Sequence, residues 1–107
     1  MTAGAGGSFR VSCSQKERDR LTVWAAKADR LGLRDQFLAA LKAINQRLSA
    51  EPLVWGDPNY RLHQLGLLVY SGIYSMFQVE YAVDEANHIV YVKQFRLLPW
   101  HPLSQDG

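Results

Sequence analysis

Histidine is the residue type in this chain that titrates near neutral pH and can act as a general acid or base. The chain has three of them, His63, His88 and His101. His63 is the best placed for proton transfer, because it stands beside Arg61 in "YRLHQL", where the sheet segment of the sequence begins. A surface or capping role is the alternative. His88 falls in a predicted turn and is expected to be solvated, and for His101, in the tail, binding and a loose end both stay open.

One cysteine and one pair of acidic residues are the other reactive groups. Cys13 precedes a predicted helix, whose N-terminus favours a thiolate, but a nucleophilic cysteine also needs a base beside it. Burial as a small residue is the simpler interpretation. Asp84 and Glu85 fall in a predicted turn, where an aspartate hydrogen-bonds to its own backbone. No two histidines have the close spacing of a zinc site, so the sequence predicts neither a metal nor another cofactor.

Length and charge narrow the class of protein. The 107 residues suit one domain, and a net charge of +2 permits an acidic partner, protein or nucleic acid, without requiring one. The single cysteine excludes an internal disulfide and favours a reducing compartment, so we expect a cytoplasmic protein. No apolar run approaches the ~20 residues of a membrane span. Residues 1–8, "MTAGAGGS", lack the pattern of a secretory signal and are expected to form a flexible tail.

The first half of the chain predicts one short strand and two helices. Residues 9–13 alternate apolar and polar side chains, as a strand does. Ser14 and Glu17 fit a capping box at the start of a helix that runs to about Leu31. A second helix ends before Pro52, and the short joint between the two predicts an antiparallel helical hairpin. Each helix has an apolar stripe: Leu21, Trp24, Ala25, Ala28 and Leu31 in the first, and Phe37, Leu38, Leu41, Ile44 and Leu48 in the second.

The second half of the chain predicts a sheet. Residues 51–60, with two prolines and a glycine, are expected to form a loop. From Tyr60 the pattern becomes extended, and this strand leads through "LLVY" (67–70) to "SG" (71–72), a turn signal. Two strands, 76–83 and 89–98, form a hairpin around a polar break. The first strand is apolar on one face, with Phe77, Val79, Tyr81 and Val83. The second strand has large apolar side chains on both faces, which is typical of a central strand that is covered on both sides. One face carries Ile89, Tyr91, Phe95 and Leu97, and the other carries Val90 and Val92.

These elements predict an α+β domain with the order β-α-α-β-β-β, in which a helical hairpin packs on one face of an antiparallel sheet. The domain spans residues 9–98, and residues 99–107, with two prolines, form a tail that leaves the sheet. The aromatic and aliphatic residues are sufficient for a core that folds without a metal or a disulfide.

The order of elements and several motifs resemble the RelE/ParE superfamily, the small bacterial toxins of type II toxin–antitoxin pairs. The likeness covers roughly residues 9–98. It rests on the helical hairpin, the segment "LHQL" (62–65), the "YSG" turn, and "VEYAVDE" followed by "IVYV". The resemblance implies a toxin that inhibits growth and a cognate antitoxin that neutralises it.

One branch of that superfamily cleaves mRNA on the ribosome as a metal-independent endoribonuclease. Basic side chains on its concave sheet hold the phosphate and stabilise the negative charge that develops on the oxygens. Carried onto this sequence, the resemblance implies phosphate contacts from Arg61, Lys93 and Arg96. The catalytic residues would be Arg96 and His63. The sequence departs from the branch at Gln78, where the family has an arginine, and in "LGLLVY", which contains no lysine.

Two alternatives stay open. A gyrase-inhibiting member of the same fold, or an inactive relative, acts by binding and needs no nuclease residues. An unrelated small RNA-binding domain would stack bases on exposed aromatic residues of its sheet. Four aromatic residues either line an apolar groove for an antitoxin segment or close loops by packing: Trp55, Tyr70, Tyr74 and Trp100. The basic residues of the first helix form either a nucleic-acid stripe or a solvated face.

Overall fold

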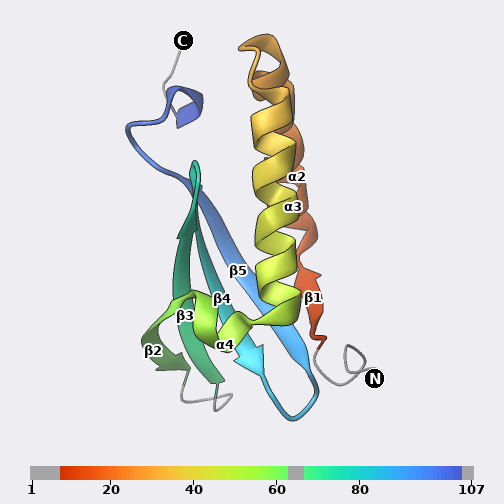
Figure 1. Ribbon diagram of the computed structural model, residues 1–107, viewed down its shortest axis with the longest axis vertical. Coiled ribbons are helices and arrows are strands. Elements are labelled where there is room, and N and C mark those ends of the chain that lie inside the picture. The colour runs from red at the N-terminus through yellow and green to blue at the C-terminus, as the bar shows by residue number, and fades with distance from the viewer. Residues whose placement is uncertain (1–7, 63–66, 105–107) are drawn as a thin grey trace.

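The computed structural model describes residues 8–62 and 67–104, and for residues 59–62 it describes the backbone alone. Two long helices and a one-turn helix lie on one side of a five-stranded sheet (Figure 1). The predicted α+β class is therefore confirmed. In chain order the elements are β1 (Arg10–Cys13), α2 (Gln15–Arg30), α3 (Arg34–Ala50), α4 (Pro52–Trp55), β2 (Asp57–Leu62), β3 (Leu67–Tyr74), β4 (Phe77–Asp84), β5 (Ile89–Leu97) and the 3-10 helix η1 (Pro102–Ser104).

The strand order in the sheet is β1-β5-β4-β3-β2. β1 pairs with β5 in parallel, with Val11 opposite Val90, and the other neighbours are antiparallel. The predicted β-α-α-β-β-β order with an antiparallel sheet is thus wrong in two respects. The sheet is mixed, because β1 joins it beside the last strand. The segment predicted as a loop, residues 51–60, contains α4 and the first residues of β2. α4 forms because Pro52 occupies the first turn of the helix, where its missing amide is no loss.

The turn between β3 and β4 falls at Ser75 and Met76 rather than at the predicted Ser71 and Gly72. Ser75 adopts a φ of 53°, which a tight turn requires. Gly72 lies inside β3, and a Cβ there would come within 2.8 Å of the Trp55 ring. This glycine therefore does not form a turn. It permits the close approach of an aromatic ring to the strand, which is a known reason for a glycine inside a strand.

A β-bulge in β5 changes which of its residues face the helices. The pairing with β4 skips Lys93, which is the extra residue of the bulge. As a result Val92 before the bulge and Phe95 after it are both buried against the helices, although they are three positions apart. The prediction that Phe95 shares a face with Tyr91 is wrong for this reason. So is the prediction that β5 is covered on both faces, since Tyr91 lies on the helix-free side and is 39% exposed.

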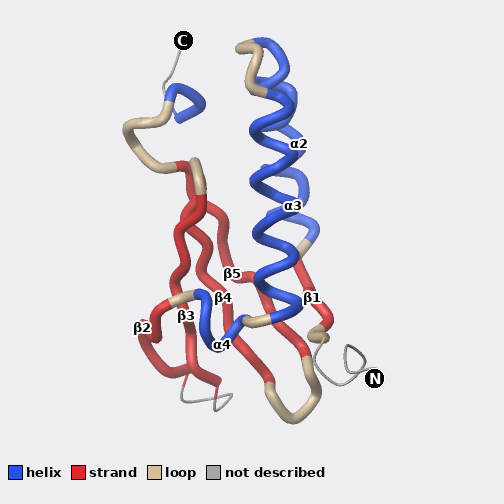
Figure 2. The backbone as a smooth tube through the Cα atoms, in the orientation of Figure 1, coloured by secondary structure: helices blue, strands red, loops and turns tan. Residues whose placement is uncertain are grey.

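The core lies between the helical hairpin and the sheet. Most of the helical residues in the core come from α3. Among them, Phe37 packs edge-on against Phe77 of β4 with ring centroids 5.3 Å apart. α2 is more peripheral, since Ala28 is buried but Leu31, at the end of the predicted stripe, is exposed. Beyond β5 the chain leaves the sheet through a loop that leads to η1 (Figure 2). Leu103 of η1 returns to the core.

Candidate functional site

The face of the sheet that points away from the helices carries the best candidate site. Side chains alternate along a strand, so the neighbours of the buried residues on β3, β4 and β5 share this face. Two rows cross these strands: Ser71, Glu80 and Gln94, and next to them Ile73, Gln78 and Arg96. We call these residues the open face.

Polar contacts organise the open face. The Gln78 amide donates a hydrogen bond to Ser71 Oγ at 3.0 Å, and Arg96 Nη2 donates to Gln94 Oε1 at 3.3 Å. The Arg96 side chain is exposed and has further N–H donors for an outside acceptor. Ile73 is 60% exposed. The open face thus offers a cation, several amide and hydroxyl groups, and one exposed aliphatic side chain.

A cleft of about 480 Å³ adjoins the open face at the edge of the sheet. The pairing of β2 with β3 begins at Asp57 opposite Ser71, so the part of β3 from Gly72 onward has no partner among the described strands on that side. We call this opening the edge cleft. Its walls are Trp55 and Pro58 on the apolar side and Asp57, Ser71 and Gln78 on the polar side. It therefore suits a ligand with both an apolar part and hydrogen-bonding groups.

Tyr81 holds Trp55 in the wall of the edge cleft. Its hydroxyl donates to the Pro52 carbonyl at 2.6 Å and accepts from the Gly56 amide at 2.9 Å. The rings of Tyr81 and Trp55 stack with centroids 5.7 Å apart. Burial raises the pKa of the Tyr81 phenol to about 12, so the group is a neutral hydrogen-bonding partner at physiological pH. Its role is to fix α4 on the sheet.

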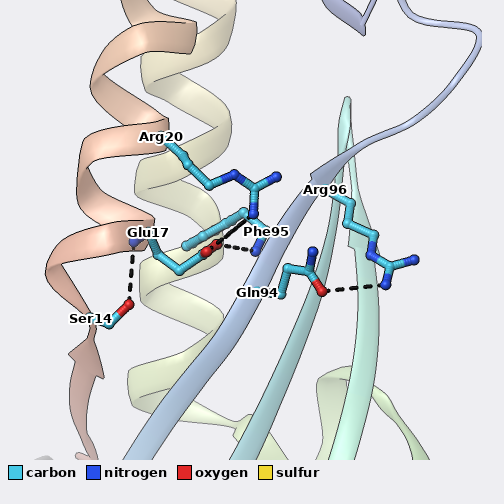
Figure 3. Close-up of polar contacts among 6 residues, drawn as sticks. All are labelled: Ser14, Glu17, Arg20, Gln94, Phe95 and Arg96. Atoms are coloured by element: carbon cyan, nitrogen blue, oxygen red, sulfur yellow. Dashed lines mark hydrogen bonds and ion pairs between the residues drawn. The ribbon is translucent and has the colours of Figure 1, made fainter.

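Glu17 fixes the segment of β5 that carries Arg96 (Figure 3). The Glu17 carboxylate is buried, and its Oε1 accepts the Phe95 amide at 2.8 Å. β1 ends at Cys13, so this amide lies beyond the strand pairing, and the carboxylate supplies the acceptor instead. Arg20 Nη1 forms an ion pair with Glu17 Oε2 at 3.1 Å, which partly neutralises the buried charge.

Only one half of the predicted capping box forms at the start of α2. Ser14 Oγ accepts the Glu17 amide at 3.3 Å, as predicted. The Glu17 side chain bonds to Phe95 instead of returning to the cap residue. In Figure 3 Gln94 and Arg96 lie on the side of β5 away from Glu17. Glu17 therefore holds this segment of β5 from the helix side, and the segment exposes Arg96 on the opposite side.

The structure does not gather the predicted phosphate-binding residues at one point. The backbone of Arg61 pairs with Leu68 on the β2 side of the sheet, whereas Arg96 lies on β5. From the spacing of strands and of residues along them, the two backbone positions are about 20 Å apart, too far to hold one phosphate group. Lys93 is exposed at the bulge, three positions before Arg96. His63 lies outside the described residues.

The other sequence candidates have structural contacts. His88 stacks on the Phe9 ring with centroids 4.6 Å apart, while remaining exposed. His101 Nδ1 accepts the Leu103 amide at 3.1 Å. Asp84 Oδ1 accepts the amide of the residue three positions later at 3.2 Å, which is the turn role expected for it. None of these contacts points to proton transfer.

Cys13 faces the helices from β1. Burial raises the pKa of its thiol, and the nearby Glu17 charge raises it further. A thiol in this environment stays protonated, so it is a poor nucleophile. Within residues 8–62 and 67–104, no group of side chains is suited to hold a metal ion. In the same part of the chain, no helix combines the length and apolar character that crossing a membrane requires.

Reading the sequence alone misses the polar wall of the edge cleft. Asp57 falls in the segment predicted as a loop, and Ser71 falls in a predicted turn. Strand alternation is the signal that could find Gln94, and the bulge at Lys93 interrupts it. Comparison of the chain with protein-family models, with curated proteins and with solved structures finds no match.

Proposed function

We propose that this protein is the growth-inhibiting toxin of a toxin–antitoxin pair and that it acts through the open face and the edge cleft. The observation that carries the proposal is one-sided packing: all of the helices α2, α3 and α4 lie on one face of the sheet, and the other face presents an exposed arginine beside a cleft. The sequence motifs that resemble the RelE/ParE superfamily support the same proposal. The site of action would be the cytoplasm.

In the catalytic form of the proposal, the toxin cleaves mRNA on the ribosome. The 2′-hydroxyl of the RNA loses its proton to a base, for which His63 is the candidate, and its oxygen attacks the adjacent phosphorus. The bond from phosphorus to the 5′-oxygen breaks, and that oxygen takes up a proton. Arg96 would stabilise the negative charge on the phosphoryl oxygens. No metal takes part.

The charges of the open face and the edge cleft support a second candidate, a non-catalytic inhibitor that binds a protein such as DNA gyrase. Glu80 lies on the open face and Asp57 lines the edge cleft, so the surface carries two carboxylates as well as the arginine. Carboxylates repel an RNA backbone, which is recognised mainly through its phosphates. A protein surface, in contrast, accommodates charges of both signs. Lys93, which is exposed at the bulge, is the nearest further cation along β5.

A base-stacking RNA-binding domain has less support. Of the tyrosine side chains that the structure describes, Tyr91 alone lies on the helix-free side. Tyr70 pairs with Tyr81 and Tyr74 pairs with Phe77, and these side chains lie on the side that the helices cover. A stacking platform for consecutive bases needs several exposed rings on one face.

An antitoxin segment would find an apolar surface beside the edge cleft. Val54 of α4 is 79% exposed and Leu53 is 39% exposed, next to Trp55 in the cleft wall. An amphipathic segment that lies on α4 and fills the edge cleft would cover Ser71, Ile73 and Gln78, the residues of the open face that line the cleft. This arrangement explains how one partner could neutralise either form of the toxin.

The test is induction of the chain in a bacterial host, with growth, bulk translation, mRNA integrity and plasmid supercoiling followed separately. Growth arrest with mRNA fragments supports the nuclease, and arrest with altered supercoiling and intact mRNA supports the gyrase inhibitor. Unchanged growth rules out a toxin. Arg96→Ala should abolish mRNA cleavage, whereas Arg34→Ala, an exposed arginine at the start of α3, should leave it unchanged.

A further inference from the structure

An apolar cleft of about 190 Å³ lies between the helical hairpin and the sheet, on the opposite side of the sheet from the open face. β1 leads directly into α2, and α3 returns beside β1, where the Phe9 amide donates to the Ser49 carbonyl at 2.7 Å. The cleft forms where these segments meet β5. We call it the hairpin cleft.

The residues at the base of the hairpin cleft are buried, and other apolar residues that line it are partly exposed to solvent. Ile44 of α3 and Phe95 of β5 are buried at its base. Val11 and Cys13 of β1 and Leu41 of α3 line it as well, and each of these keeps part of its surface exposed. When an apolar ligand covers apolar surface that is in contact with water, the free energy of the system falls, and this favours binding.

Two polar side chains stand at the cleft. Arg18 of α2 and Asn45 of α3 both line it and are exposed. Arg18 lines the cleft together with Cys13 and Leu21 of its apolar wall. Within the described part of the chain, neither the Arg18 guanidinium nor the Asn45 amide has a hydrogen-bond or ion-pair partner. The neighbouring carboxylate, Glu17, is already engaged by Arg20 and Phe95.

We propose that the hairpin cleft binds a small amphipathic carboxylic acid. Its apolar body would lie against Leu41 and Phe95, and its carboxylate would accept hydrogen bonds from Arg18 and Asn45. A cavity of about 150 Å³ with apolar walls is known to hold a benzene molecule, so the hairpin cleft has room for a chain of about six to eight carbons or one aromatic ring. The site is independent of the proposed toxin activity.

The probe is a series of straight-chain carboxylates from butanoate to decanoate, titrated into the full chain at constant ionic strength. Affinity is measured by calorimetry, and the location is measured by amide chemical shifts. We expect about a fourfold gain in affinity for each added methylene while the chain still lies in the cleft, followed by a plateau. The largest shift changes should occur at Val11, Cys13, Leu21 and Leu41.

Three controls make the test decisive. The primary amide of the same chain length lacks the charge and should bind about tenfold more weakly than the acid, since a charged hydrogen bond is lost. Arg18→Gln should remove that difference, whereas Arg30→Gln, at the other end of α2, should not. Leu41→Phe should fill the cleft and prevent binding, and if that variant does not fold, Arg18→Gln still decides. Absence of saturable binding, affinity independent of chain length, or shifts spread over the surface would each overturn the proposal.

Discussion

Replacing Glu17 by alanine should be among the most destabilising single changes in α2. Glu17 is only 4% exposed and is the acceptor for the buried Phe95 amide. Leaving that amide unpaired costs about 1–3 kcal/mol. Loss of a negative charge in the first helical turn adds about 0.3–1 kcal/mol. The ion pair with Arg20 adds little, because the Arg20 side chain is one-third exposed. We therefore expect the free energy of unfolding to fall by about 1–4 kcal/mol.

Two further variants separate the causes. Glu17→Gln keeps an acceptor for the Phe95 amide and removes only the charge, so it should cost about 1 kcal/mol. Glu51→Gln removes an exposed carboxylate from an ion pair with Arg47 and should cost at most about 0.5 kcal/mol. Together the three variants distinguish the loss of a buried acceptor from the loss of a charge.

The assay is urea unfolding followed by tryptophan fluorescence, with equal slopes required before free energies are compared. Hydrogen exchange at the Phe95 amide gives a local readout and should accelerate in Glu17→Ala more than in Glu17→Gln. If Glu17→Ala unfolds at the same urea concentration as Glu51→Gln, the carboxylate is not a structural acceptor, and the account of how β5 is anchored is refuted.

Two more predictions concern the wall of the edge cleft. Gly72→Ala places a Cβ within 2.8 Å of the Trp55 ring, so it should lower the stability by about 1–3 kcal/mol and change the Trp55 emission; a variant with wild-type stability and emission would contradict this packing. Tyr81 has a folded-state pKa of about 12, above its ordinary value near 10. The unfolded phenol then ionises first, so Tyr81 stabilises the fold below about pH 10 and this contribution is lost as the pH rises toward about 12. Tyr81→Phe should lose less stability than the wild type between about pH 9 and about pH 11, and equal losses would disprove the assignment.

Local signals in the sequence were sufficient for the two long helices, but not for α4, which lies in the segment predicted as a loop. The Ser14 side chain caps α2, and α3 ends just before Pro52, because capping and proline geometry act over a few residues. β4 was also predictable, since its apolar residues alternate without interruption. These elements define the α+β class but not the way in which they join.

The arrangement of the sheet depends on contacts between distant residues. No local pattern states that β1 pairs with β5, and Gly72 has the same appearance in the sequence whether it forms a turn or admits an aromatic ring. The bulge at Lys93 shifts the alternation of β5 by one residue, so the faces of its second half were assigned wrongly.

The candidate site was predictable only in part for the same reason. Arg96 is exposed on the helix-free side, which suits the role predicted for it, but Arg61 belongs to a strand that the sequence analysis treated partly as loop. The distance between them follows from strand order, which is a property of the whole fold.

The measurement that tests the central proposal most directly is bacterial growth after induction of two matched variants. Ile73→Glu alters the open face, and Val23→Glu alters an exposed apolar residue of α2, on the helical side of the molecule. Both side chains are at least 60% exposed, so both variants should fold. The proposal predicts that the wild type and Val23→Glu arrest growth and that Ile73→Glu does not. Growth arrest by Ile73→Glu at the wild-type level, or no arrest by the wild type, would contradict it.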